Sequence, residues 1–429
     1  MTDESSVPVP ASFQQERHWY RRDRTTNGTR RNMAFAARLD AELDHDAFQA
    51  SVAELAARHE VLRTTLYEDG GEVWQRVHGR PMVSCDVVDL RDRPDGAATA
   101  VARVEARLRG EFDLAHGPLA TITLFRLTET EHLLAIVCNH VVGDGWSFRI
   151  ALDELGELYR SRAAGRPAAL PPLASQYGDY ARWQREWATS ADAREHADYW
   201  KRLLYGRPGK QLPRHAETGA AGVVPIALGT ELTGELRAFA RSARTTVFVL
   251  LLTAYAIELR DRLGDDDVLV AIAVARRQRP QTHPLIGFFA GAVCLRLSLG
   301  GATTFAEAVR RVHDASMSAL AHEELDLTAY LRLVEPDRDE DADPIACAGF
   351  FFEPPVSGLD FAGIGLTPVE LGRDFVPGQV EAALHDDGQR VTGTLSYSAG
   401  VLGQDEAAAF AARYRELLAT AAHDPNQRI

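Results

Sequence analysis

The chain has 429 residues, 45% hydrophobic and 25% charged, and this ordinary balance excludes wholesale disorder, collagen-like repeats and a coiled coil. Its 47 Lys and Arg residues against 61 Asp and Glu give a formal net charge of −14, which argues against a binder of the nucleic-acid backbone. A chain of this length predicts roughly two or three compact units.

The first half of the chain alternates helical and extended patterns. One extended run is apolar throughout, which predicts a strand buried on both faces. A strand, an irregular loop and a helix then follow one another, an order that can aim side chains and backbone N–H groups into a cleft. In chain order, the predicted elements are a helix over residues 44–58, strands over 62–66, 119–127 and 133–138, a loop over 139–145, and a helix from Phe148 to about Arg162.

The second half shows the same mixture, so we expect a mixed α/β protein in two halves. The stretch 165–173, which contains Pro and Gly, predicts a boundary between an N-terminal domain over residues 1–170 and a C-terminal domain over residues 171–429. The predicted elements are helices over residues 232–243, 246–263, 305–320 and 406–421, strands over 268–274, 292–299 and 346–352, and a hairpin pairing 379–384 with 391–397.

The cysteines and the N-terminal residues bear on location. The cysteines lie far apart without a Cys-x-x-Cys pair, which predicts reduced thiols and no zinc or redox centre. The first residues lack the basic and apolar regions of a signal peptide, and no apolar run approaches the length of a membrane span. We therefore expect a cytoplasmic location and no membrane partner. The cysteines are Cys85, Cys138, Cys294 and Cys347.

A short arginine-rich patch stands out against the acidic balance. One such cluster does not offset the rest of the chain, so we interpret it as a solvated loop rather than a nucleic-acid site. Its charge also suits docking to an acidic partner protein. The patch consists of Arg21, Arg22, Arg24, Arg30 and Arg31.

The most informative stretch is residues 138–147, which read Cys-Asn-His-Val-Val-Gly-Asp-Gly-Trp-Ser. A histidine after a buried strand can act as a base, because its ordinary pKa of about 6.5 leaves it largely neutral at pH 7. Gly143 and Gly145 allow backbone to approach a reacting centre. Taken alone, a single histidine such as His140 is more often structural than catalytic.

Several segments carry the motifs of one enzyme family, in that family's order. Residues 139–147 match five of the six specified positions of the pattern His-His-x-x-x-Asp-Gly followed by an aromatic residue and Ser, with Asn139 at the first His. The other motifs are Ser-x-x-Gln-x-Arg-x-Trp at residues 12–19, Arg-His-Glu-x-Leu-Arg-Thr at 58–64, the segment 112–119, Tyr-x-Asp-Tyr-Ala-x-Trp-Gln at 177–184, and an Ile-Gly-x-Phe element at 286–296. Over nearly the whole chain, the sequence resembles the condensation domains of nonribosomal peptide synthetases.

The resemblance implies an α/β fold of two chloramphenicol-acetyltransferase-like lobes. It further implies a V-shaped pseudodimer with the active site in the tunnel between the lobes. The N-terminal lobe is expected to carry the active-site motif, and the C-terminal lobe the floor-loop and latch elements.

The resemblance also implies roles for the motif residues. His140 aligns with the family's catalytic second His, which accepts or orients the proton of the nucleophile. Asp144 pairs in the family with the Arg of the Leu-Arg-Thr element, here Arg63, so both are assigned to loop shape rather than chemistry. Gly145 is assigned space and a backbone N–H near the substrate. Ser147 is expected to bond locally and not to act as a nucleophile, since no Gly-x-Ser-x-Gly elbow surrounds it.

The chain departs from the family pattern at two places. Asn139 can support the loop by hydrogen bonds, but it cannot accept a proton at neutral pH. Residues 290–292 read Ala-Gly-Ala where the family usually has Val-Asn-Thr, which implies a wider channel at the tunnel floor. Trp146 is expected to pack at the start of the helix. The candidates for the substrate tunnel are Trp146, Ser147, Ala290 and Gly291.

The function implied is a free-standing condensation enzyme acting in trans, because the chain shows no adenylation or carrier segment. It would move an acyl or aminoacyl group from a carrier-protein thioester to an amine or hydroxyl, forming an amide or ester. We expect no metal or redox cofactor on the enzyme itself; the phosphopantetheine arm belongs to the partner peptidyl or acyl carrier protein. The docking candidates for that acidic partner are Arg21, Arg22 and Arg24.

Two alternatives stay open at this point. One is a carrier-dependent O-acyltransferase that acts on a soluble alcohol. The other is a non-catalytic recruitment module on the same fold, suggested by Asn139 in place of the first motif His. The sequence leaves the donor, the acceptor, the bond type and the oligomeric state undetermined.

Overall fold

A computed structural model describes residues 8–21, 32–206, 209–213, 221–338, 345–353, 359–371 and 379–429. The chain forms two compact units, and each unit draws on three separate stretches of sequence. Unit 1 comprises Met1–Ser190, Ala275–Ala290 and Gly358–Arg373, and unit 2 comprises Ala191–Val274, Gly291–Ser357 and Asp374–Ile429. This division differs from the predicted single boundary after residue 170.

The main sheet of unit 1 has the strand order β14-β2-β7-β6-β5. Its central strand, β7, pairs antiparallel with β2 on one side and β6 on the other. Residues 132–139 of β7 are all buried, as their continuous apolar run predicts. The strands are β2 (Asn32–Asp40), β5 (Val83–Asp89), β6 (Ala120–Arg126), β7 (Glu131–Asn139) and β14 (Thr367–Pro368).

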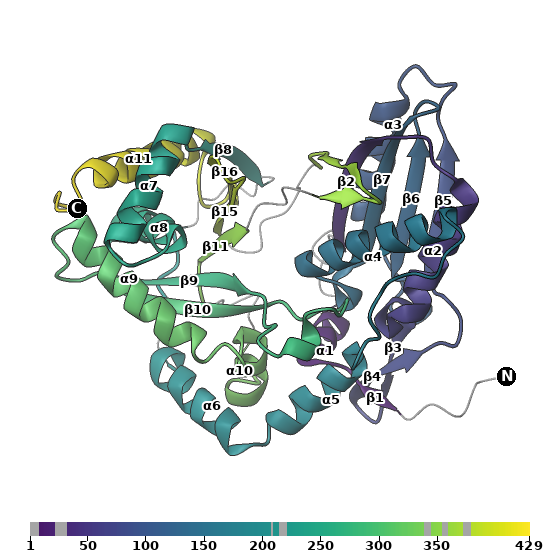
Figure 1. The fold of residues 1–429 in the computed structure, drawn as a ribbon. Helices are drawn as coiled ribbons and strands as arrows, with labels where there is room; N and C mark the ends of the chain where they lie inside the picture. Colours follow the sequence, from purple (N-terminus) through teal and green to yellow (C-terminus); the bar gives the residue numbers. More distant parts are fainter. Residues whose placement is uncertain are drawn as a thin grey trace. The chain divides into compact units, whose positions relative to one another are not determined.

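Two helices, α2 and α4, cross the same face of this sheet and pack against each other (Figure 1). The apolar spacing that predicts α2 is confirmed, because Phe48, Val52 and Leu55 are all buried. A third helix, α3, packs against β2 and β7. The helices are α2 (His45–Arg58), α3 (Gly96–Arg109) and α4 (Gly145–Ala163).

A smaller sheet, β1-β4-β3, completes the N-terminal part of unit 1, with β1 against α5. Helix α5 belongs to this unit because the buried Tyr177 hydroxyl lies 2.8 Å from Ser12 Oγ and 2.9 Å from Phe288 O. These contacts are the physical reason why residue 170 is not the boundary. The elements are β1 (Val9–Pro10), α1 (Phe13–Tyr20), a 3₁₀ turn (Glu60–Arg63), β3 (Thr64–Asp69), β4 (Glu72–Val77) and α5 (Tyr177–Trp187).

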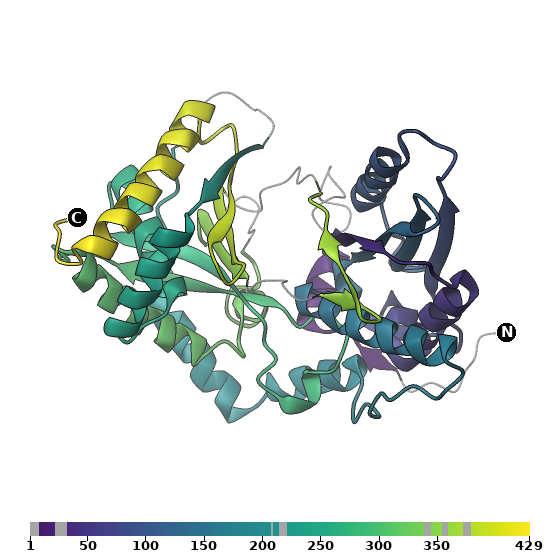
Figure 2. The same cartoon turned by 45° about the horizontal axis from the view of Figure 1, so that its top comes forward.

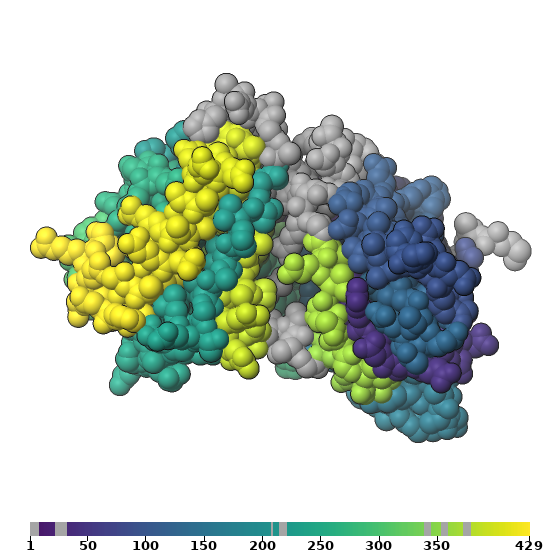
Figure 3. Space-filling view, turned by 90° about the horizontal axis from the view of Figure 1, so that it is seen from above, coloured from purple at the N-terminus to yellow at the C-terminus, as the bar shows by residue number. Residues whose placement is uncertain are grey.

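Two late segments of the chain also belong to unit 1. The later of these two segments, Gly358–Arg373, contains β14, which pairs with β2. Next to this pair, the Val369 N–H donates to Ala36 O at 2.9 Å. Figure 3 shows this yellow-green segment beside the purple strand β2. Its hairpin packs on α4 where Gly156 has no side chain, since a Cβ there would lie 2.7 Å from Ala362 N. The hairpin strands are β12 (Asp360–Phe361) and β13 (Ile364–Gly365), and the first segment holds a 3₁₀ turn (Pro280–Thr282).

Unit 2 is built on a six-stranded sheet with the order β10-β9-β11-β15-β16-β8. Strand β11 pairs parallel with β9 and β15, and the remaining pairs are antiparallel. The strands are β8 (Gly222–Ala227), β9 (Asp267–Val274), β10 (Gly291–Ser298), β11 (Ala348–Glu353), β15 (Val380–Asp386) and β16 (Val391–Tyr397).

The core helix of unit 2 is α8, which is buried without interruption from Val249 to Leu259. It packs against α7, α9 and α11, and Figure 2 shows α11 in yellow beside the teal helices. The helices are α6 (Ala191–Leu204), α7 (Thr230–Ser242), α8 (Val247–Leu263), α9 (Phe305–Leu320), α10 (Leu327–Val334) and α11 (Gln404–His423).

The structure confirms the helices, strands and hairpin that the sequence predicts for the second half. In the first half, α4 begins at Gly145 rather than at Phe148, and β3 begins at Thr64 after a 3₁₀ turn. Among the described residues no single helix is long and apolar enough to cross a membrane, although α7 and α8, bent by 104°, pass such a test as a pair.

Candidate active site

The candidate site is the loop that follows the buried strand β7. A short 3₁₀ turn, His140–Val142, continues from the strand end. The Asn139 side chain caps this turn: its Oδ1 accepts the Val141 N–H at 3.1 Å, and its Nδ2 donates to Asn32 Oδ1 at 3.1 Å. Asn139 thus gives the loop the hydrogen-bond support expected of it.

The orientation of the His140 ring follows from one hydrogen bond. Nδ1 lies 2.8 Å from Gly143 O, and because a carbonyl oxygen only accepts, Nδ1 must carry the proton. In the neutral ring Nε2 then holds the free lone pair. Burial lowers the pKa of His140, while the carboxylate of Asp144 partly opposes this. His140 is therefore a neutral imidazole at pH 7, with Nε2 able to accept a proton.

Aromatic rings surround His140. The Phe288 ring lies against it with the centroids 4.0 Å apart, and the His18 ring approaches edge-on at 5.8 Å. His18 also contacts Phe288, with the centroids 5.0 Å apart. Neither residue was a candidate on the sequence, although both lie within recognised motifs. Periodicity alone gives no indication that α1 and residues 275–290 meet at this loop.

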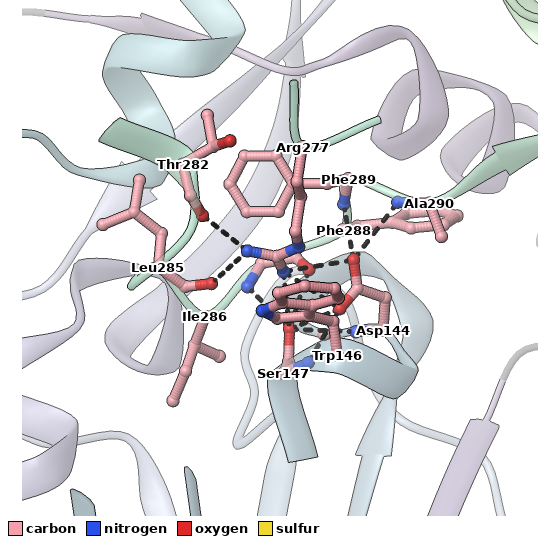
Figure 4. A network of polar contacts seen from close by, with 12 residues as sticks. Asp144, Trp146, Ser147, Arg277, Thr282, Leu285, Ile286, Phe288, Phe289 and Ala290 are labelled. Carbon is pink, nitrogen blue, oxygen red and sulfur yellow. Dashed lines mark hydrogen bonds and ion pairs between the residues drawn. The ribbon is translucent and has the colours of Figure 1, made fainter. Parts of the chain in front are cut away.

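Asp144 is the centre of the polar network drawn in Figure 4. It caps α4 by accepting the Ser147 N–H at 2.9 Å. Its other oxygen accepts the backbone N–H groups of Phe289 and Ala290 at 3.1 and 3.2 Å. Arg277 Nη2 lies 3.1 and 3.3 Å from the two carboxylate oxygens. The buried charge is thus both paired and hydrogen-bonded, as a stable buried ion pair requires.

The partner of Asp144 differs from the one expected. Arg63 was predicted to pair with Asp144, but its Nη1 donates to His78 O at 2.5 Å and its Nη2 to Glu60 Oε1 at 3.4 Å. The pair is made instead by Arg277, whose side chain is only 2% exposed. Arg63 is not available to Asp144 because its guanidinium bonds close to the 3₁₀ turn Glu60–Arg63, to Glu60 and to His78 O.

Arg277 fastens residues 275–290 to the start of α4. Its Nη1 donates to Thr282 O at 2.6 Å and Leu285 O at 2.8 Å, while Nη2 reaches Asp144 (Figure 4). The guanidinium also lies over the Phe289 ring, 4.1 Å from its centroid. Burial lowers the pKa of Arg277 and the Asp144 carboxylate raises it again. An arginine keeps its charge here, so the network holds a permanent ion pair.

The three residues after Asp144 form the first turn of α4 and differ in their contacts. Ser147 Oγ lies 2.7 Å from Asp144 Oδ1, a local contact, and 3.0 Å from Gly287 O in the distant segment 275–290. A Cβ at Gly145 would meet no atom within 4 Å, so packing does not demand a glycine there. Trp146 lies at the start of α4 and is 50% exposed; its Nε1 donates to His283 O at 3.3 Å, and the Arg277 guanidinium lies 5.7 Å from the centroid of its ring.

The remaining candidates are distributed over the chain. Ala290 joins the Asp144 network through its backbone, whereas Gly291 opens strand β10 of unit 2. Arg21 is the C-cap residue of α1, and Arg22 and Arg24 lie outside the described residues. Among the described residues, no group of three or more His, Cys, Asp or Glu side chains is placed to hold a metal ion.

The thiol next to the loop does not supply an alternative nucleophile. Cys138 is buried, and burial raises its pKa to about 12, so the thiol is protonated at neutral pH. A Cβ at Gly143 would lie 3.3 Å from its sulfur, so Cys138 fills space beneath the loop. The titratable side chain of the loop suited to accept a proton at neutral pH is therefore His140.

Comparison with known proteins gives the family. The model of a family described as Condensation domain matches residues 6–429. One of the linear gramicidin synthase proteins of Brevibacillus parabrevis is 32% identical over 432 residues, which cover 98% of this chain and 8% of that protein. Malpinin synthetase of Mortierella alpina is 30% identical over 91% of this chain and 5% of its own length. The chain thus spans a small part of the curated relatives that it matches.

Solved structures agree with this match. The X-domain from teicoplanin biosynthesis superposes with a TM-score of 0.85 at 26% identity, and the match covers 99% of this chain and 97% of the X-domain chain. A second structure contains this X-domain in complex with OxyB. The condensation domain of the Monacolin K polyketide synthase MokA has a TM-score of 0.87, covering 99% of both chains, and at 21% identity it supports the fold. A match along nearly the whole length shows that the chain belongs to the condensation domain family of nonribosomal peptide synthetases, with the two-lobed chloramphenicol-acetyltransferase-like fold that its motifs predicted.

Proposed function

We propose that this condensation domain is an active acyltransferase in which His140 is the proton acceptor. It would move an acyl or aminoacyl group from a carrier-protein thioester to an amine or hydroxyl acceptor. The observation that carries the proposal is the bond from His140 Nδ1 to Gly143 O, which leaves Nε2 as the basic nitrogen. We further propose that the domain holds no cofactor of its own and that the phosphopantetheine arm arrives with the carrier protein.

The proposed reaction balances without an oxidant or a metal. The acceptor nitrogen or oxygen attacks the thioester carbonyl, and its proton passes to Nε2 of His140. A C–N or C–O bond forms, the C–S bond breaks, and the thiol of the arm leaves with a proton returned from His140. Asp144 and Arg277 hold the loop and do not exchange protons with the substrate, since both are committed to their own ion pair.

The partners belong to the same proposal. An acidic carrier protein would dock through the basic patch around Arg21, Arg22 and Arg24, because a chain with a net charge of −14 needs a local positive surface for it. We propose a cytoplasmic location, in line with four cysteines that are free thiols. The acceptor would be a second carrier-bound group or a small molecule; a carrier-dependent O-acyltransferase would be distinguished by its use of a soluble alcohol.

The test is intact-mass analysis of acyl-loaded carrier protein, incubated with the whole chain and a panel of free and carrier-bound amines and alcohols. We expect the acyl mass to move to one acceptor class, and His140→Ala to slow this transfer by about 10²-fold or more. His116→Ala is the matched control, because its side chain is 82% exposed and contacts only Asp113 among the ion pairs of the described residues. Transfer by His140→Ala at the rate of the control would contradict the proposal.

A second candidate is recruitment of another protein without catalysis. The observation in its favour is the X-domain at 26% identity, which has been solved in complex with OxyB. The same mass experiment separates the two candidates. A recruitment module would leave every acyl-loaded carrier unchanged across the acceptor panel, with or without His140.

A further inference from the structure

Helix α1 brings a second imidazole to the active-site loop. The His18 ring lies edge-on to the His140 ring, with the centroids 5.8 Å apart and the planes at 72°. Phe288 contacts both, at 5.0 Å from His18 and 4.0 Å from His140. These three rings, His18, His140 and Phe288, form what we call the ring cluster.

The position of His18 is coupled to the loop through α1. Ser12 caps the helix by accepting the Gln15 N–H at 3.2 Å. The Gln15 side chain then donates from Nε2 to Val141 O at 2.9 Å, in the turn that begins with His140. A buried hydrogen bond therefore ties the helix that carries His18 to the turn that carries His140.

The other titratable and charged groups around His140 have fixed roles. On β7, Cys138 is an uncharged thiol at neutral pH. At the start of α4, Asp144 is negative, but its charge is matched by Arg277 from residues 275–290. From α1, His18 places a further imidazole in ring contact with His140.

We propose that His18 is a positioning residue that forms a coupled pair with His140 and thereby sets the pH range in which His140 Nε2 can accept a proton. Two imidazoles this close do not titrate independently, because a proton on one disfavours a proton on the other. A protonated His18 keeps His140 neutral to lower pH.

This inference rests on the proposed function for its catalytic meaning, but its first test needs no turnover. The whole chain is labelled with ¹⁵N at histidine, and the titration midpoint of His140 is followed by NMR, with His140→Ala used for assignment. In His18→Phe and His18→Gln we expect the His140 midpoint to rise by about half to one pH unit, since a neighbouring cation is removed. Midpoints in both variants within about 0.2 unit of the unchanged chain would overturn the coupling.

The two variants separate titration from packing. His18→Phe keeps an aromatic ring in the ring cluster, and His18→Gln keeps polarity at a similar size, so a packing role alone leaves at least one of them with the original midpoint. The order of protonation is read from the unchanged chain, in which the His18 midpoint should lie above that of His140; in His140→Gln the His18 midpoint should move little, because His140 is still neutral when His18 takes up its proton. These measurements cover the case in which a His18 variant fails to fold, and a His18 midpoint below that of His140 in the unchanged chain would overturn the proposal.

The second test reads activity. The acid limb of kcat/KM should move to higher pH in His18→Phe by the same amount as the NMR midpoint of His140. An NMR shift without transfer activity in any variant would contradict the proposed function while preserving the coupled pair. If the acid limb of kcat/KM stays at the same pH while the NMR midpoint of His140 moves, His18 does not set the pH range of the reaction, and that part of the proposal is overturned.

Discussion

A single carboxylate organises the active-site loop. Asp144 caps α4, binds two backbone N–H groups of residues 289–290 and pairs with Arg277. The motif resemblance assigned Asp144 to loop structure with Arg63 as its partner, whereas in the structure the ion pair of Asp144 is made by Arg277. Arg277 follows a predicted strand, and nothing in its local pattern distinguishes it from a solvated charge.

At this scale we predict that Asp144→Asn destabilises the chain by about 3–5 kcal/mol, because it leaves the Arg277 charge buried and unpaired. Urea denaturation measures the loss. Arg63→Ala is the matched control, and it should cost only about 1 kcal/mol, since it removes hydrogen bonds to His78 O and Glu60. Equal costs for the two variants would show that Arg277 is not the partner that matters.

At the scale of elements, the segment 275–290 owes its path to close packing. Gly287 lies where the Tyr177 ring of α5 passes, and a Cβ at this position would come within 2.2 Å of Tyr177 Cδ2. Both its backbone groups bind Ser147 Oγ of α4. The Ile-Gly-x-Phe element is therefore a packing motif, and a glycine is needed at position 287 because the Tyr177 ring occupies the space of a side chain.

We expect Gly287→Ala to destabilise the chain by about 1–3 kcal/mol, because the added methyl group forces Tyr177 or the segment 275–290 to move. The midpoint of thermal or urea unfolding reports the change. Gly145→Ala is the control, since a Cβ there would meet no atom within 4 Å, and its stability should stay within about 0.5 kcal/mol. A Gly287→Ala chain as stable as the control would contradict this packing.

At the scale of the whole molecule, unit 1 is not a continuous stretch of chain. Residues 275–290 supply the charge that balances Asp144, and β14 supplies an edge partner for β2. A cut after residue 190 would remove both. The N-terminal stretch thus lacks the contacts that complete its own core.

We predict that a fragment of residues 8–190 does not unfold cooperatively, because Asp144 loses Arg277 and two backbone donors at once. Circular dichroism during heating tests this, with the full chain as the reference. A fragment that melts cooperatively at the temperature of the full chain would show that the later segments are dispensable for this unit.

The sequence by itself determined most elements of both units and the loop that carries His140. Helical and extended patterns are local, so residues a few positions apart suffice to predict α2, β7, α8 or the β15–β16 hairpin. The motif around His140 is likewise contiguous. Only the tertiary structure decided that Asp144 pairs with Arg277, 133 residues away, and that His18 lies beside His140. Such pairs depend on how distant segments pack, and local periodicity carries no information about that.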